Sequence, residues 1–398
     1  MREPLVQTQV IPYLRELVKG GHEISLLTFE PKSTETENDV SAAEKIKDQL
    51  TQDRIEWHWL RYHKNPSVPA TLFDIGNGAR FIRSLNKNKK FDILHARSHV
   101  PMMMAALTWK ISQHKPKLLF DIRGFMPEEY VDAGVWPEGG LVYRGVKRVE
   151  KWLMNVADGF VVLTEKAKTI LSDAIGNRPV EVIPCCVDLK RFEAANKGSR
   201  NDVRNSLGIG DRFTLAYVGA FGGWYLTKET AEFYKILKEM RPDTFALILT
   251  QSDPASIEQL LRSGGFSESD FHIAKVSAGE IPRYLSAADA AVSFIKPCFS
   301  KQASSPTKNA EYLACGLPII ANAGVGDVDM QLTEDKTGII LTELSEIGYR
   351  RAADELGLLG EQTELAARCI NSSKVRFDLG SVGGERYRRL YATLVPRY

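Results

Sequence analysis

The stretch Ser304-Ser305-Pro306-Thr307-Lys308-Asn309-Ala310-Glu311-Tyr312-Leu313-Ala314-Cys315-Gly316-Leu317-Pro318-Ile319-Ile320-Ala321 decides how the rest of the sequence is interpreted. Its residue types predict a loop, a helix, a tight turn and a buried strand. Serine caps helix N-termini, and proline is favoured in the first turn. Gly316 ends the predicted helix, and Pro318 prevents its continuation. The apolar run at residues 319–321 is typical of a parallel strand that is covered on both faces.

The start of this helix has the properties of an anion site. A helix N-terminus presents unpaired amides and a partial positive charge to an anion. Lys308 adds a full positive charge in the first turn, and Glu311, one turn later, can accept hydrogen bonds from a pair of hydroxyls. A diphosphate attached to a ribose matches this layout. The local pattern leaves a structural alternative open, because Ser-Pro is common at helix starts and the helix dipole alone favours Glu nearby.

The segment Ser305 to Pro318 resembles the nucleotide-sugar signature of retaining glycosyltransferases with the GT-B fold, of the glycosyltransferase family four kind. The resemblance implies that Glu311 holds the ribose hydroxyls of the donor. It also implies that the preceding loop wraps the donor diphosphate; this loop comprises Ser304, Ser305, Pro306, Thr307 and Lys308. The common form has a second Glu eight residues before the first, where this sequence has Ala303. The sugar contact of that second Glu is therefore in doubt here.

Composition sets limits on the class of protein. The chain has 398 residues, a length typical of two domains. Hydrophobic residues make up 43% and charged residues 26% of the chain, values typical of a globular protein. A net charge of +2 gives no reason to expect a nucleic-acid partner, although a local charge excess would permit peripheral contact with a membrane. Five irregularly spaced cysteines predict a reducing, cytoplasmic location. We expect no signal peptide after Met1 and no membrane span.

The remaining sequence alternates between strand and helix patterns, which predicts an α/β protein with two Rossmann-like domains. We expect an N-terminal domain at residues 1–190, a nucleotide-sugar domain at 191–380, and a C-terminal helix at 381–398 that returns to the first domain. The polar segment 184–205 is predicted to be an irregular linker. The GT-B resemblance implies that the two domains face each other across a cleft. It also implies a first strand before the helix predicted at residues 4–20, and that strand is missing, which we interpret as a truncated start.

Ligands of parallel sheets bind beyond the carboxyl ends of the strands. In the second domain, the run Gly219-Ala220-Phe221-Gly222-Gly223 follows a predicted strand and resembles the first phosphate loop of the family. Glycines there let the backbone approach a phosphate closely, although a turn built only for its shape remains an alternative. Val276 stands where the family holds the base with backbone atoms.

Lysines follow the strand that ends near residue 295. Lys296, Lys301 and Lys308 are predicted to lie at one end of the sheet, where positive charge stabilises a leaving diphosphate without a metal. We expect Lys301, and Lys228 after the glycine-rich run, to be ordinary surface residues.

Two strand ends of the first domain also have polar side chains. Asp121 and Arg123 follow an apolar strand and are candidates for catalysis, with a structural salt bridge as the alternative. Arg123 stands where the family often has a His beside the donor sugar. His99 and Glu128 are candidates for acceptor binding, whereas His95 is interpreted as a surface residue.

We therefore predict a metal-independent, retaining glycosyltransferase without a cofactor. It would move a sugar from a nucleotide sugar to a sugar or lipid-linked acceptor, in surface polysaccharide or glycolipid synthesis. Two alternatives remain at this point. One is a nucleotide-sugar epimerase on the same fold, and the other is an inactive nucleotide-sugar-binding protein, which Ala303 and Arg123 would favour.

Overall fold

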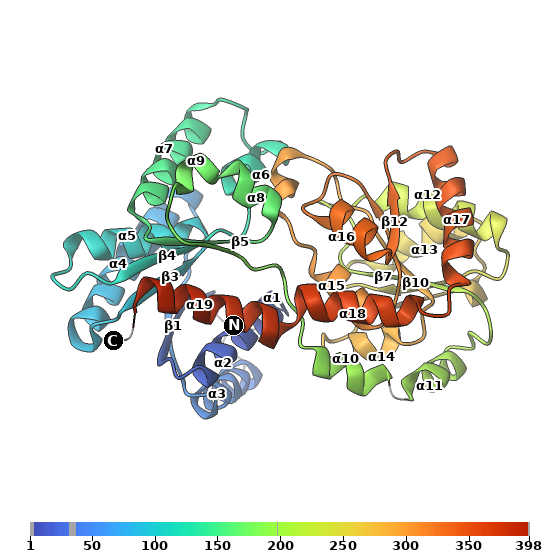
Figure 1. Cartoon of the computed structure of the whole chain (residues 1–398), viewed down its shortest axis with the longest axis horizontal. Coiled ribbons are helices and arrows are strands. Elements are labelled where there is room, and N and C mark those ends of the chain that lie inside the picture. Colours follow the sequence, from blue (N-terminus) through green and yellow to red (C-terminus); the bar gives the residue numbers. More distant parts are fainter. Residues whose placement is uncertain (1–3, 32–36, 197, 397–398) are drawn as a thin grey trace. The chain divides into compact units, whose positions relative to one another are not determined.

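A computed structural model describes residues 4–31, 37–196 and 198–396 of the chain (Figure 1). The chain forms two compact units. The first unit comprises Met1–Ile183 and Leu379–Tyr398, and the second comprises Pro184–Asp378. The last helix therefore belongs to the first unit, and the divisions fall after Ile183 and Asp378 rather than at the expected 190 and 380.

The first unit contains two parallel sheets of strand order β1-β2 and β3-β4-β5-β6. Its strands are β1 (Ile24–Glu30), β2 (Ile55–Arg61), β3 (Ile93–Arg97), β4 (Lys117–Asp121), β5 (Gly159–Val162) and β6 (Val180–Val182). Its helices are α1 (Pro4–Gln9), α2 (Ile11–Lys19), α3 (Glu37–Gln52), α4 (Ser67–Lys89), α5 (His99–Ile111), α6 (Met126–Asp132), α7 (Leu141–Val156), α8 (Glu165–Ile170), α9 (Ser172–Ile175) and α19 (Glu385–Leu394).

The two sheets of the first unit are linked by side chains of the C-terminal helix. Among the described residues, no strand pairs with both β1 and β3. The ring of Tyr391 in α19 lies 5.1 Å from that of His22, which precedes β1, and 6.0 Å from that of His95 in β3. Helix α19 thus contacts both parts of the unit through one aromatic side chain.

The second unit has one six-stranded parallel sheet of order β12-β11-β10-β7-β8-β9. Its strands are β7 (Thr214–Val218), β8 (Phe245–Leu249), β9 (Phe271–Ala274), β10 (Ala290–Ser293), β11 (Ile319–Asn322) and β12 (Gly338–Leu341). Its helices are α10 (Leu189–Asn196), α11 (Ser199–Ser206), α12 (Thr227–Met240), α13 (Pro254–Ser263), α14 (Ile281–Leu285), α15 (Thr307–Ala314), α16 (Val328–Asp335), α17 (Glu346–Gly360) and α18 (Leu365–Phe377).

The sheet of the second unit is covered on both faces, as the apolar run at 319–321 predicted. Successive residues of a strand point to opposite faces. Leu215 and Ile320 belong to the core on one face, and Ala216 and Ile319 to the core on the other. The α/β class and the parallel sheets are confirmed.

Several expected boundaries were wrong. The segment 184–205 is not an irregular linker, because Phe192 of α10 and Val203 of α11 are almost completely buried and hold both helices on the core. The predicted helix at residues 4–20 is two helices, α1 and α2, with Val10 between them.

Candidate functional site

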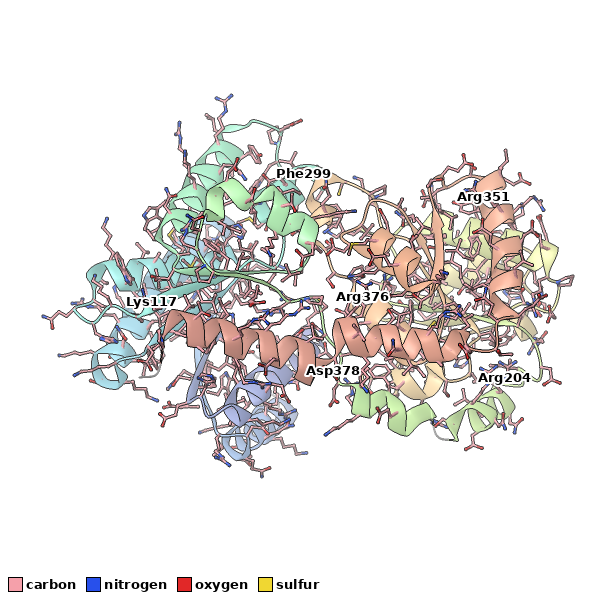
Figure 2. The ribbon with its side chains drawn as sticks, viewed as in Figure 1. Lys117, Arg204, Phe299, Arg351, Arg376 and Asp378 are labelled. Atoms are coloured by element: carbon pink, nitrogen blue, oxygen red, sulfur yellow. The ribbon has the colours of Figure 1, made fainter. Side chains whose placement is uncertain are left out.

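Three segments of the second unit meet at the carboxyl ends of two neighbouring strands, β7 and β10. They are the glycine-rich run after β7, the pair Trp224-Tyr225, and the segment from Phe299 to Lys308 before and into α15. A β-bridge joins Tyr225 to Ile295, just beyond β10. Phe299, labelled in Figure 2, lies at the start of the third segment and is about half exposed. These contacts bring together the glycine-rich run and the helix start that the sequence singled out.

Lys308 is the central cation of the site. Its side chain is buried, with the Nζ atom 4.5 Å from the ring centre of Tyr217 and 4.1 Å from that of Tyr225. In the part of the chain that the structure describes, this Nζ has no hydrogen-bond partner. Burial lowers the pKa of Lys308 to about 7, and the negative charge of Glu311 offsets only part of that shift. The site therefore holds an ammonium group that lacks an acceptor.

The glycine-rich run touches this lysine. Gly219 has a φ of +134°, and a Cβ at this position would lie 3.4 Å from Lys308 Nζ. Gly222 and Gly223 also have positive φ and are exposed. Gly219 thus combines a backbone conformation that favours glycine with the close approach of the Lys308 side chain, and the approach of the run to a phosphate stays a prediction.

Glu311 lies one turn after Lys308 on the same face of α15 and is also buried. Burial raises the pKa of its carboxyl group to about 7, and the nearby charges of Arg191 and Lys308 counteract the shift only in part. Arg191 is in α10, where its guanidinium donates to the Ala278 carbonyl (2.7 Å). Sequence reasoning missed this arginine because it falls in the segment expected to be a linker.

The start of α15 differs from its prediction in how it is capped. Pro306 is the N-cap residue, and no side chain caps the helix. The hydroxyl of Ser305 instead accepts a hydrogen bond from the amide of Cys185 (3.1 Å). The predicted serine cap was wrong. Within the first turn, the Asn309 amide donates to the Pro306 carbonyl (3.0 Å), so only the amides of Thr307 and Lys308 are proposed to meet another acceptor. Ser304 precedes this turn and is half-buried.

The other candidates of the second unit divide into three cases. The Val276 carbonyl accepts a hydrogen bond from Gln251 Nε2 (3.0 Å), so this oxygen already has a partner. Lys296 and Lys228 are exposed. Lys301 was expected at the surface but is buried, with its Nζ 3.9 Å from the ring centre of Trp224.

In the first unit, Asp121 is completely buried at the end of β4 and lies within a polar network. The Tyr387 hydroxyl donates to Asp121 Oδ2 (2.9 Å), and guanidinium nitrogens of Arg97 and Arg123 lie 3.4 and 3.5 Å from the carboxylate. Burial alone would raise the pKa of Asp121, but Arg123, His95 and Arg97 hold it well below its usual range. His95 is not the surface residue that we expected, because its Nδ1 lies 2.9 Å from the Tyr391 hydroxyl.

The two acceptor candidates are tied to α7. His99 is buried, with its Nε2 2.9 Å from Glu150 Oε1. The Tyr143 hydroxyl donates to Glu128 (3.1 Å), and Lys147 forms a salt bridge with the same carboxylate (2.9 Å). Both residues therefore help to pack α5 and α6 against α7. They belong to the first unit, whereas Lys308 and Glu311 belong to the second.

The described ranges contain no group of three or more His, Cys, Asp or Glu side chains arranged to hold a metal ion. They also contain no helix that is long and apolar enough to cross a membrane.

Comparisons with known proteins agree with this architecture. No curated protein sequence matches the chain significantly. Among solved structures, a glycosyltransferase from Rickettsia africae superimposes with a TM-score of 0.71 at 14% identity, covering 100% of this chain and 97% of that one. HepE from Anabaena, in complex with UDP-glucose, has a TM-score of 0.61 at 16% identity and coverages of 93% and 100%. WaaG, a glycosyltransferase involved in lipopolysaccharide biosynthesis, has a TM-score of 0.62 at 15% identity and coverages of 97% and 95%.

These structural matches show the GT-B fold. Family models identify the chain more directly. The model of Glycosyltransferase Family 4 matches residues 6–191, and that of Glycosyl transferases group 1 matches residues 199–376, a range that includes Gly219, Lys308 and Glu311. The chain is a glycosyltransferase of the GT-B type and belongs to the group 1, family 4 glycosyltransferases.

Proposed function

We propose that this glycosyltransferase takes its sugar from a nucleoside diphosphate sugar bound by the second unit and transfers it with retention of configuration. The observation that carries the proposal is Lys308, a buried ammonium group with no hydrogen-bond acceptor among the described residues, one turn before the buried Glu311. A cation kept from water without a partner is costly, and a bound diphosphate would remove that cost.

Each part of the donor has a partner in this proposal. The diphosphate lies against Lys308, the first amides of α15 from Thr307, and the backbone of Gly219. Two ribose hydroxyls donate to the Glu311 carboxylate. The base lies near Val276. HepE binds UDP-glucose, and this favours UDP as the nucleotide to test first.

The reaction breaks the bond between the anomeric carbon and the diphosphate oxygen, and the electron pair leaves with the diphosphate. An acceptor hydroxyl forms the new bond from the same face, and its proton passes to the departing phosphate oxygen. Lys308 and the α15 N-terminus stabilise the charge that develops there, which is why we propose a reaction without a metal cofactor. The acceptor is proposed to be a sugar or a lipid-linked sugar.

The candidates of the first unit receive more limited roles. Asp121 has no exposed surface, so we assign it as a positioning residue that orients Arg97 and Arg123. Arg123 is the proposed contact to the transferred sugar. His99 and Glu128 are proposed to shape the acceptor region through their bonds to α7.

A thermal-shift measurement with UDP, GDP and ADP tests the donor site. A ligand well above its dissociation constant that binds only the native state stabilises it by about 3 kcal/mol. We expect one nucleotide to raise the unfolding temperature of the native chain and of Glu361→Ala, an exposed control on the same unit. Glu311→Ala should lose this shift, because the ribose hydroxyls lose their acceptor.

Two outcomes would count against the proposal. An equal shift in Glu311→Ala would remove Glu311 from the site. A nucleotide sugar that binds but yields no free nucleotide with a range of sugar and lipid-linked acceptors would favour the inactive binding protein.

A further inference from the structure

Helices α4, α5 and α7 of the first unit carry a concentrated positive charge. They pack in sequence, α4 against α5 and α5 against α7, and Figure 1 shows them on one part of that unit. Their sequences contain nine lysines and arginines but only two carboxylates, Asp74 and Glu150. The whole chain has an excess of only two positive charges, so the rest of the sequence is net negative. We name these three helices the α4–α5–α7 layer.

Both carboxylates of the layer are turned away from solvent and already have partners. Asp74 is buried and accepts from the His63 amide (2.9 Å). Glu150 pairs with His99 and Lys147. They therefore neutralise little of the charge on the outer surface.

Most cations of the layer lack a carboxylate partner. Lys89 pairs with Glu56, and Lys147 with Glu128 and Glu150. Over the ranges that the structure describes, the other seven form no salt bridge, and all seven are exposed: Arg80, Arg83, Lys87, Lys110, Arg144, Arg148 and Lys151.

Exposed apolar side chains lie beside these cations on α4. At about 100° per residue, Val68, Leu72, Phe73, Arg80, Arg83 and Lys87 fall within roughly 140° of the helix circumference. Leu72 is 63% exposed and Phe73 is 56% exposed. The first turns of this face are thus apolar, and the later turns are cationic.

Helix α7 repeats the combination. Leu141 is 87% exposed and Val142 52%. Together with Val149 they occupy an arc that adjoins the arc of Arg144 and Arg148, and the two arcs span about half of the circumference. Single exposed apolar side chains are common on proteins, but a group of them that adjoins a cationic arc indicates an interaction surface.

We propose that the α4–α5–α7 layer binds the surface of an anionic lipid bilayer. The cations attract acidic headgroups, and the exposed side chains of Leu72, Phe73 and Leu141 enter the boundary between headgroups and acyl chains. The charges are spread over three helices, which suits a laterally mobile array of headgroups. The inference goes beyond the donor site and does not depend on it.

Flotation of the full chain with vesicles tests the proposal, without any nucleotide. We expect binding to vesicles rich in phosphatidylglycerol, weakening as salt is added, and little binding to pure phosphatidylcholine. The variant Arg80→Gln/Arg83→Gln/Lys87→Gln should lower the partition coefficient by about 100-fold, since each cation near such a surface contributes about one kcal/mol. Leu72→Ser/Phe73→Ser should weaken the part of the binding that persists at high salt.

The matched control is Lys228→Gln/Lys235→Gln/Arg351→Gln, which removes three exposed cations from helices of the second unit; Arg351 is labelled in Figure 2. It should bind vesicles as the native chain does. An equal loss in this control would show a general charge effect and overturn the assignment. Absence of vesicle binding would also overturn the assignment, even if the layer were then found to bind an acidic protein or a second copy of the chain. Because every substituted side chain is exposed, unchanged unfolding temperatures will show that the variants are folded.

Discussion

Lys308 is held in the ligand-free protein at a cost in stability. Its ammonium group lies against two tyrosine rings, and burial disfavours its charge more strongly than Glu311 favours it. Such a residue is expected at a binding site, where a charge that lowers the stability of the fold is retained because it binds the ligand. Stability and ligand affinity should therefore respond in opposite directions when the charge is removed.

We predict that Lys308→Met stabilises the ligand-free protein by about 1–3 kcal/mol, because an apolar side chain of similar length replaces a buried cation that has no hydrogen-bond acceptor among the described residues. The same variant should lose most of its affinity for the nucleoside diphosphate. Urea unfolding and titration calorimetry measure the two effects.

Lys296→Met is the control for this prediction, because it removes an exposed lysine from the same strand end. It should leave stability within about 0.5 kcal/mol. If Lys308→Met destabilised the free protein while diphosphate binding persisted, the side chain would have a structural role and the diphosphate assignment would fail.

The sequence could predict Lys308 and Glu311 but not their surroundings. Both lie one helical turn apart in a recognisable motif, so their proximity follows from helix geometry. Arg191, Tyr217 and Tyr225 act on the same two groups from distant parts of the chain, and nothing in their local sequence indicates it. The burial of Lys301 was missed for the same reason, since its Trp224 partner is in another segment.

At the scale of elements, α19 is attached to β4 by a buried polar contact. The Tyr387 hydroxyl donates to Asp121, whose other carboxylate oxygen has no hydrogen-bond partner in the described part of the chain. The contacts of Asp121 Oδ2 with Arg97 and His95 are longer, at 3.4 Å each, so the Tyr387 hydroxyl is its shortest hydrogen bond. This bond therefore contributes to the position of the last helix on the first unit.

We predict that Tyr387→Phe lowers the free energy of unfolding by about 1–3 kcal/mol, because it leaves a buried charged acceptor without its shortest hydrogen bond. Nucleotide affinity should be unchanged, since the proposed donor residues belong to the second unit. Tyr62→Phe, in which the removed hydroxyl belongs to a half-exposed side chain, serves as the comparison. Equal stability of the two variants would show that the Asp121 contact is energetically unimportant.

Elements were predictable where their signal was local. Strand β7 and helix α12 have local signals in the sequence, because an apolar run defines the strand and helical periodicity defines the helix. Helices α10 and α11 were missed because their polar composition hides single buried residues, Phe192 and Val203. Strand β12 is short and gains its stability from pairing with β11, which a local pattern does not reveal.

At the scale of the whole molecule, net properties conceal local ones. The net charge of +2 gave no indication of the cationic α4–α5–α7 layer, because the excess is balanced elsewhere in the chain. The fold itself was predictable, since the motif around Glu311 and the alternation of strands and helices both indicated the GT-B architecture that the comparisons show. The division of the first unit into two sheets depends on long-range pairing and is a property of the assembled fold.

The stability of the whole chain should depend on pH through the buried pair. Burial raises the pKa of Glu311 from 4.5 to about 7, so the stability that its proton confers is fully present below pH 4.5 and is lost as the pH rises to about 7. Burial lowers the pKa of Lys308 from 10.5 to about 7, so its contribution is present above pH 10.5 and is lost as the pH falls to about 7. Both contributions are therefore weakest near neutral pH.

We predict that the unfolding temperature of the native chain, relative to that of Lys308→Met/Glu311→Gln, passes through a minimum near pH 7. The double variant is the reference because it keeps every other titrating group, so the difference isolates the pair. A saturating nucleoside diphosphate should remove the minimum, since it stabilises the ammonium form of Lys308 and its ribose hydroxyls stabilise the carboxylate form of Glu311. A flat difference between pH 5 and 10 would show that the pair is solvated in solution, and the free-energy argument for an anion at Lys308 would then fail.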